Sequence, residues 1–90
     1  SLVQPLTPSA VTTDRWSVQI GAYTSRDAVD DALRRAHAKL PGSLAHANAQ
    51  IVPLTTSEGV LFRARLGNLT QAQATEACQY FRDCLPVSPR

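Results

Sequence analysis

Two arginines stand two positions apart in the segment VLFRARL, which alternates apolar and polar residues. Arg63 and Arg65 would therefore point to the same side of a strand, and each guanidinium offers a fixed fork of donors to a carboxylate. A second alternating segment, WSVQIGAY, adds Gln19, a neutral donor and acceptor. Tyr23 and Leu61 could pack on the apolar face of a sugar ring. This mixture favours an extended, weakly acidic polysaccharide over a phosphate polymer, and the alternative is an ordinary solvated sheet face.

No nucleophile system accompanies these residues. The sequence holds no Ser-x-x-Lys and no Gly-x-Ser-x-Gly motif, and its glycines form no Gly-x-Gly-x-x-Gly phosphate loop. His37 and His46 have no ligand pattern around them, so both are interpreted as partly exposed structural residues. We therefore expect no catalytic residue, no metal and no cofactor.

The two cysteines, Cys78 and Cys84, stand 6 positions apart. This spacing fits neither a CxxC redox motif nor a zinc site, which would need four ligands. A disulfide between them is the sharper interpretation and would indicate an oxidising compartment. The alternative is two free thiols, with Cys78 buried as a small apolar residue.

The elements that must position these residues form a repeat, and its first unit opens with a strand over residues 16–23. Trp16 has the parity of the inner face and is expected in the core. Thr24 followed by Asp27 predicts a capping box at the start of a helix, which Pro41 and the glycine after it would end. A short strand, AQIVPL, comes next, and its proline favours an edge position for that strand.

The second unit repeats the same order. A strand over residues 60–66 precedes Gly67, and Thr70 with Gln73 again has capping-box spacing before a helix. Gly21 and Gly67 are 46 positions apart, and the flanking strand and cap residues match at the same shift. A last short strand over residues 84–87 completes the unit.

Two β-α-β units of this kind predict an α+β fold with the order β-α-β-β-α-β. Such a pseudo-repeat interleaves into a four-stranded antiparallel sheet with both helices on one face, a ferredoxin-like or RNP-like architecture. The other face would be bare and is the natural candidate site. By strand parity it should collect these residues: Ser17, Gln19, Tyr23, Leu61, Arg63, Arg65 and Leu85.

Composition limits the remaining possibilities. The chain has 90 residues, 43% of them apolar, which suits one small domain over residues 15–88 after a Pro/Ser/Thr-rich linker over residues 1–14. We expect this piece to come from the C-terminal end of a longer protein. A net charge of +2 with interspersed signs does not indicate nucleic-acid binding, and no apolar run is long enough to insert into a membrane. A monomeric module is expected.

The segments WSVQIGAYTSRDAV and FRARLGNLTQAQA together resemble the two halves of the SPOR (sporulation-related repeat) family. The resemblance covers roughly residues 15–88. It implies a fold like an RNA-recognition module and binding of peptidoglycan, with a preference for denuded glycan strands whose stem peptides amidases have removed. It also implies a periplasmic, septal location in the bacterial cell envelope.

The resemblance assigns the glycan site to the exposed sheet face. It carries over to Gln19, Leu61, Arg63 and Leu85, whereas the other three face residues, Ser17, Tyr23 and Arg65, join by parity only. Family members often have a hydroxyl residue in place of Ala22 and an aromatic one in place of Leu61, which implies fewer contacts here.

A further stretch, LFRARLGNLTQAQATEAC, resembles the tails of some proteobacterial D-alanyl-D-alanine carboxypeptidases. That resemblance implies a module that tethers a serine peptidase to the septal wall.

Two other functions compete with glycan binding. An RNA-binding module of the same architecture would stack bases on aromatic residues of its central strands, where this chain has Gln19, Arg63 and Arg65. A protein-interaction module of the cell-division machinery would instead hold a partner on the sheet face or on a helix.

Overall fold

The computed structural model describes residues 15–89. The linker expected over residues 1–14 lies outside the described residues. The elements run in the order β1 (Trp16–Tyr23), α2 (Arg26–Lys39), the 3-10 turn η1 (Gly42–Leu44), β2 (Asn48–Thr56), β3 (Gly59–Leu69), α3 (Gln71–Ala77), the 3-10 turn η2 (Cys78–Tyr80) and β4 (Leu85–Val87).

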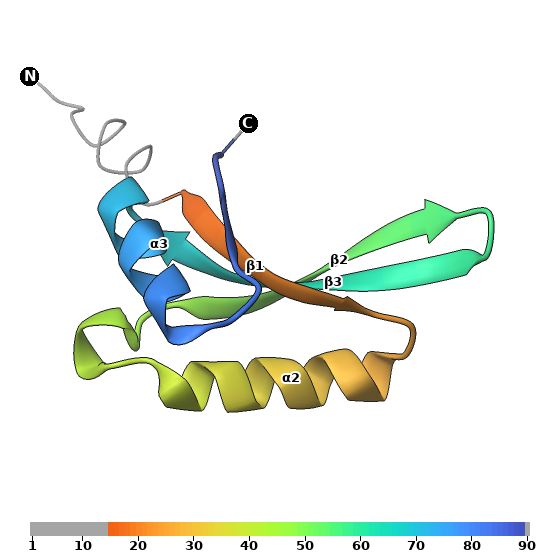
Figure 1. The fold of residues 1–90 in the computed structure, drawn as a ribbon, viewed down its shortest axis with the longest axis horizontal. Coiled ribbons are helices and arrows are strands. Elements are labelled where there is room, and N and C mark those ends of the chain that lie inside the picture. The colour runs from red at the N-terminus through yellow and green to blue at the C-terminus, as the bar shows by residue number, and fades with distance from the viewer. Residues whose placement is uncertain (1–14, 90) are drawn as a thin grey trace, which may run out of the picture.

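The four strands form one antiparallel sheet in the order β2-β3-β1-β4. The two central strands therefore come from different repeat units, and β2 and the short strand β4 lie at the edges (Figure 1). This is the interleaved α+β architecture that the repeat predicts, and the prediction is confirmed.

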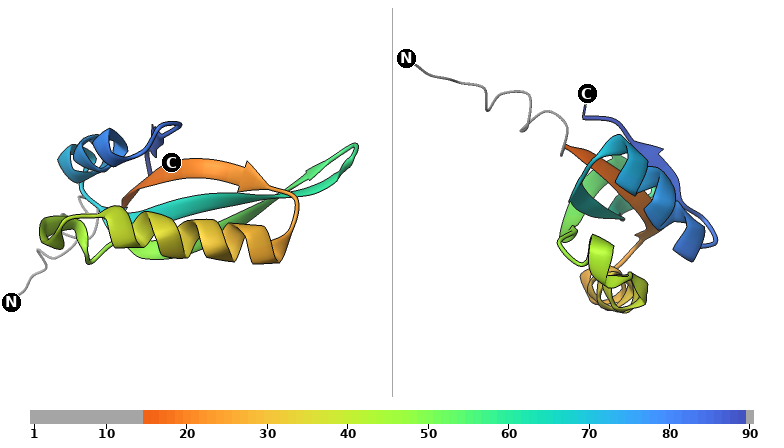
Figure 2. Two further views of the ribbon diagram at one scale, coloured as in Figure 1. Left: turned by 60° about the horizontal axis from the view of Figure 1, so that its bottom comes forward. Right: turned by 90° about the vertical axis from the view of Figure 1, so that its left-hand side faces the viewer.

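Both helices pack on one side of the sheet and share its core. Val18 and Leu66 of the central strands are fully buried there, together with Val29 of α2 and Ala74 of α3. Figure 2 shows α2 running along the sheet and the shorter α3 near the end of the sheet that lies away from the β2–β3 hairpin. Trp16 packs against the same core, as its position in the first strand predicts.

The helix caps agree with the sequence in one unit and differ in the other. At α3 both bonds of the predicted capping box are present: Gln73 N donates to Thr70 Oγ1 at 3.1 Å, and Thr70 N donates to Gln73 Oε1 at 3.0 Å. At α2 the cap is Ser25, not Thr24, because the Ser25 hydroxyl is the one that accepts from the N–H of Ala28, at 3.1 Å.

A β-bulge interrupts the alternation of β1. Gln19 pairs with Arg65 but Gly21 pairs with Ala64, so β1 holds one residue more than β3 over this step. An extra residue reverses the side to which every later side chain points. Tyr23 therefore pairs with Phe62 on the helix side, and its ring passes so close to Gly21 that a Cβ there would lie 2.8 Å from the phenol oxygen.

The β2–β3 hairpin extends beyond the end of β1, as Figure 1 shows. The last residue of β1 pairs with Phe62, so residues 59–61 of β3 have only β2 as a neighbour. The turn is closed by Thr56, whose hydroxyl donates to the carbonyl oxygen of Gly59 at 2.8 Å, and Gly59 has a φ of 126°. At this left-handed φ any side chain would be strained. Leu54 and Val60 near the tip are exposed.

Neither helix within residues 15–89 has the length and apolar character needed to cross a bilayer.

Candidate functional site

The sheet face opposite the helices is bare and carries side chains from all four strands. Its members alternate with the buried residues Val18, Ala64 and Leu66, which point to the core. We call this surface the open face. It comprises Gln19 and Ala22 of β1; Gln50, Val52 and Leu54 of β2; Leu61, Arg63 and Arg65 of β3; and Leu85 of β4.

One row of paired residues crosses the whole open face. Gln50 pairs with Arg65, Arg65 pairs with Gln19, and Gln19 pairs with Leu85. Within this row Arg65 Nε donates to Gln19 Oε1 at 3.0 Å. Three inter-strand spacings of ~4.8 Å make the row roughly 14 Å long. The sheet thus presents a polar line perpendicular to its strands, with an apolar end at β4.

The amide of Gln50 lies over Gly67 at one end of this row. A Cβ on Gly67 would lie 2.1 Å from Gln50 Nε2, so only glycine leaves room for the amide in this position. Gly67 is therefore a positioning residue for Gln50.

A second row lies two residues further along β3. Val52 pairs with Arg63, which pairs with Ala22. Arg63 Nε donates to the carbonyl oxygen of Val52 at 3.2 Å, and this bond holds its side chain over β2. Because each arginine uses its Nε for a protein acceptor, the Nη donors of both remain for a ligand.

The electrostatics of the open face favour an acceptor. Burial lowers the pKa of Arg65, and the like charge of Arg63 lowers this pKa further. An arginine keeps its proton under physiological conditions despite such a shift, so both charges persist. A ligand carboxylate or carbonyl between the two side chains would relieve their repulsion, and none of the open-face residues is acidic.

Apolar side chains flank the arginines at two corners. Leu54 pairs with Leu61 on the hairpin, and Leu85 at the opposite edge is 66% exposed. Apolar surface beside fixed donors is the combination that sugar rings require, since they have apolar faces and hydroxyl edges.

The disulfide between Cys78 and Cys84 fixes the strand that carries Leu85. The bond is present, with the two Cα atoms 5.2 Å apart, and confirms the sharper interpretation of the cysteine pair. It ties η2 to the residue that immediately precedes β4.

Beside the disulfide, a hollow of about 440 Å³ borders the open face. Its lining residues are Gln19, Gly21, Ala22, Arg82, Asp83, Cys84 and Leu85.

Five of the seven predicted face residues come together on the open face: Gln19, Leu61, Arg63, Arg65 and Leu85. The predicted side is wrong for Tyr23, and the predicted exposure is wrong for Ser17. Tyr23 lies on the helix side because the bulge in β1 reverses its direction. Ser17 has the same parity as Gln19 and pairs with Val87 of β4, but its side chain is only 7% exposed. Parity predicts the side of the sheet on which a residue lies and not how exposed it is.

Part of the open face was not predicted from the sequence. No site residue was predicted on β2, although Gln50, Val52 and Leu54 share one parity in AQIVPL. Ala22 has the inner-face parity of Trp16, whereas the bulge turns this residue toward Arg63 on the open face.

The histidines take part in bonds within the domain. His37 Nε2 lies 3.0 Å from the carbonyl oxygen of Ala45, and His46 Nε2 lies 3.3 Å from Gln73 Oε1. In the described part of the chain no three His, Cys, Asp or Glu side chains are grouped closely enough to hold a metal ion.

The SPOR domain family model matches residues 12–84, which is most of the chain. The chain belongs to the SPOR domain family. SPOR domains are non-catalytic modules that bind peptidoglycan, so this domain is a cell-wall binding module and not an enzyme. Its geometry is consistent with that role, because the open face offers fixed donors and apolar surface without a nucleophile.

The fold of this SPOR domain is similar to that of the RlpA SPOR domain from Pseudomonas aeruginosa. The TM-score is 0.62 and the sequence identity is 18%, over 82% of this chain and 99% of the other. At this identity the likeness establishes the fold and not the details of the site. No curated protein sequence matches the chain.

Proposed function

We propose that the open face binds denuded glycan strands of peptidoglycan and thereby targets a parent cell-wall protein to the division septum. The observation that carries this proposal is the row from Gln50 through Arg65 and Gln19 to Leu85, which crosses all four strands. An extended polymer laid along this row would meet the amide and guanidinium donors of Gln50, Arg65 and Gln19, and then the apolar side chain of Leu85 at the β4 end.

Two consequences of removing the stem peptide would favour binding of denuded strands to the open face. An amidase cuts the amide bond between the lactyl group of the sugar and the peptide, which leaves a free carboxylate on the glycan. Arg63 and Arg65 can bind such a carboxylate through their free Nη donors. The cut also removes bulk that would keep the sugar rings away from a continuous sheet surface.

The disulfide between Cys78 and Cys84 supports a periplasmic location, because disulfides persist in oxidising compartments. For the parent protein we propose a D-alanyl-D-alanine carboxypeptidase, on the resemblance of the second repeat unit to the tails of such enzymes. In that arrangement the SPOR domain would hold the peptidase near the peptidoglycan of the division septum.

Isothermal titration with purified denuded glycan chains tests the proposed ligand. We expect saturable binding by the wild-type domain and at least about a tenfold loss of affinity in Arg63→Ala. Arg34→Ala is a matched control, because Arg34 is an exposed arginine on α2, away from the open face. Equal losses in both variants, or no binding by the folded wild type, would refute the assignment of the open face.

A further inference from the structure

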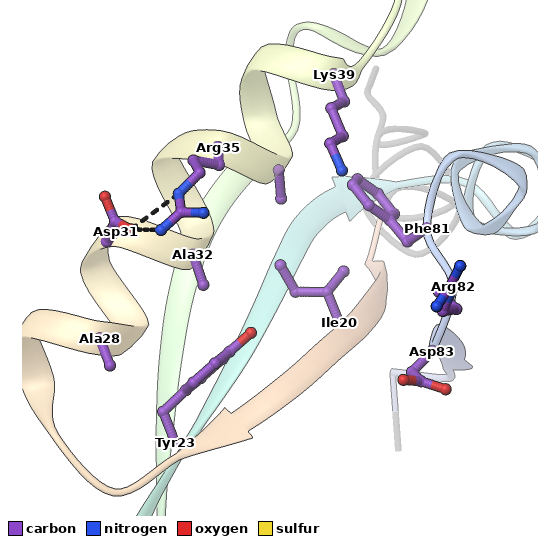
Figure 3. A pocket seen from close by; sticks show the side chains of 11 residues that line it. Ile20, Tyr23, Ala28, Asp31, Ala32, Arg35, Lys39, Phe81, Arg82 and Asp83 are labelled. Atoms are coloured by element: carbon purple, nitrogen blue, oxygen red, sulfur yellow. Dashed lines mark hydrogen bonds and ion pairs between the residues drawn. The ribbon is translucent and has the colours of Figure 1, made fainter.

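The helix side of the domain has a cleft of its own. It lies between α2 and the segment that leads from η2 to β4, and its volume is about 440 Å³. Figure 3 shows its lining residues: Ile20 and Tyr23 of β1; Ala28, Asp31, Ala32, Arg35 and Lys39 of α2; and Phe81, Arg82 and Asp83. Such a volume is within the range of binding pockets of proteins, roughly 300–1,000 Å³.

The cleft is hollow because α2 presents small residues to it. Ala28, Ala32 and Ala36 recur at intervals of four, so they lie one above another along one side of the helix. The opposing wall is Phe81, and Ile20 forms part of the floor. The interior is thus apolar and lined by an aromatic ring, as in a pocket that receives an apolar side chain.

The rim of the cleft carries an excess of positive charge. Asp31, Arg35 and Lys39 lie on the α2 side of the cleft, and Arg82 and Asp83 lie on the opposite side, so three basic residues stand against two acidic ones. The carboxylate of Asp31 is already paired, with Arg35 and also with Arg34 at 2.9 Å. In Figure 3 the Lys39 side chain extends from α2 toward the Phe81 ring, so an ammonium group lies beside the apolar interior.

We propose that this cleft is a docking site for a short acidic segment of a partner protein, which inserts an apolar side chain between α2 and Phe81. Carboxylates flanking that side chain would pair with Lys39 and Arg82 at the rim. Charge complementarity of this kind steers association and fixes the register of a bound segment.

The cleft and the open face lie on opposite sides of the sheet, so both ligands can bind at once. The segment with Arg82 and Asp83 separates the cleft from the hollow beside the open face, since both residues line both cavities. The domain would then act as an adapter that connects wall glycan to an acidic protein segment. The docking site is independent of whether the open face binds glycan.

The test uses a fluorescein-labelled acidic peptide, EDELFEDE, and a basic peptide of equal length, KRKLFKRK, in anisotropy titrations of residues 1–90. We expect the acidic peptide to bind saturably and the basic peptide not to bind. Ala32→Leu should reduce that affinity at least about tenfold by filling the cleft without any change in charge, and Lys39→Glu should reduce it similarly. Circular dichroism checks that each variant is folded.

The control is Arg15→Glu, which makes the same charge change at an exposed arginine outside the cleft. The docking site is refuted if the folded wild type does not bind the acidic peptide, or if Arg15→Glu weakens binding as much as Lys39→Glu. Unchanged affinity in both Ala32→Leu and Lys39→Glu would also refute it. If Arg63→Ala abolishes peptide binding, the peptide occupies the open face and the cleft is not its site.

Discussion

Arg65 Nε lies 3.0 Å from the side-chain oxygen of Gln19, its partner in the β1–β3 pairing. The bond links the central strands of the two repeat units and fixes the direction of the Arg65 guanidinium on the open face. The two side chains should therefore act on a ligand as one unit.

A double-mutant cycle tests this coupling. Gln19→Ala and Arg65→Ala should each weaken binding of denuded glycan, and the double variant should lose less than the sum, with a coupling of about 1 kcal/mol. The reason is that Gln19→Ala already releases the arginine from its position. Calorimetric titration of the four proteins provides the measurement.

The control cycle pairs Gln19→Ala with Leu54→Ala. Leu54 pairs with Leu61, and Gln19 pairs with Arg65. Leu61 and Arg65 are four residues apart on β3, so about 13 Å of strand separates the two pairs. Losses at that distance should add. Additive losses for Gln19 and Arg65 as well would contradict the idea of a joint unit.

Tyr23 should matter for stability and not for glycan binding. Its ring packs against the core between α2 and Gly21, so Tyr23→Ala removes apolar contacts on the helix side. We expect the free energy of unfolding to fall by about 1–3 kcal/mol, measured by urea denaturation, with unchanged glycan affinity of the folded protein. A loss of affinity without a loss of stability would instead place Tyr23 on the open face.

The alternation of residues predicts β3 correctly and β1 only in part. In β3 nothing interrupts the pleat between Leu61 and Leu66, so parity alone separates Arg63 and Arg65 from the core. In β1 the bulge beside Gly21 adds a residue, and no periodicity reveals it because both Ala22 and Tyr23 are plausible on either side.

Other features of the site depend on contacts that are far apart in the sequence. The Gln50 amide lies over Gly67 only because β2 pairs with β3 in one register, which the turn at Thr56 and Gly59 sets. The caps show the opposite case, since the Thr70 box is a local arrangement and was predicted in full. At the first helix Thr24 and Ser25 are adjacent, and only the geometry selects Ser25.

The contact between Gln50 and Gly67 gives another prediction. In Gly67→Ala the new methyl group would displace the Gln50 amide, which is the mobile end of a long side chain and can swing away. The cost in stability should be below about 1 kcal/mol, whereas glycan affinity should fall because the amide leaves its row. Titration of Gly67→Ala with denuded glycan measures this effect.

Gln50→Ala provides the matched background for that experiment. Once the amide is absent, adding Gly67→Ala should cause no further loss of glycan affinity. If the double variant loses as much again as Gly67→Ala alone, the glycine acts through something other than Gln50.

The disulfide should contribute to both stability and binding. It closes a short loop between Cys78 and Cys84, and chain-entropy reasoning gives about 2 kcal/mol for a loop of this length. Reduction should lower the urea midpoint accordingly and weaken glycan binding, because β4 and its exposed Leu85 lose their anchor. An identical midpoint with and without reductant would show that the bond does not stabilise the domain.

The most direct test of the open face as a reader of denuded glycan is co-sedimentation with purified sacculi, either intact or treated with amidase. We expect the wild-type domain to sediment more strongly with treated sacculi, and a variant carrying both Gln19→Ala and Arg63→Ala to stay in solution. Equal sedimentation of that folded double variant and the wild type would show that the open face does not bind the glycan, as would a folded wild type that binds neither preparation.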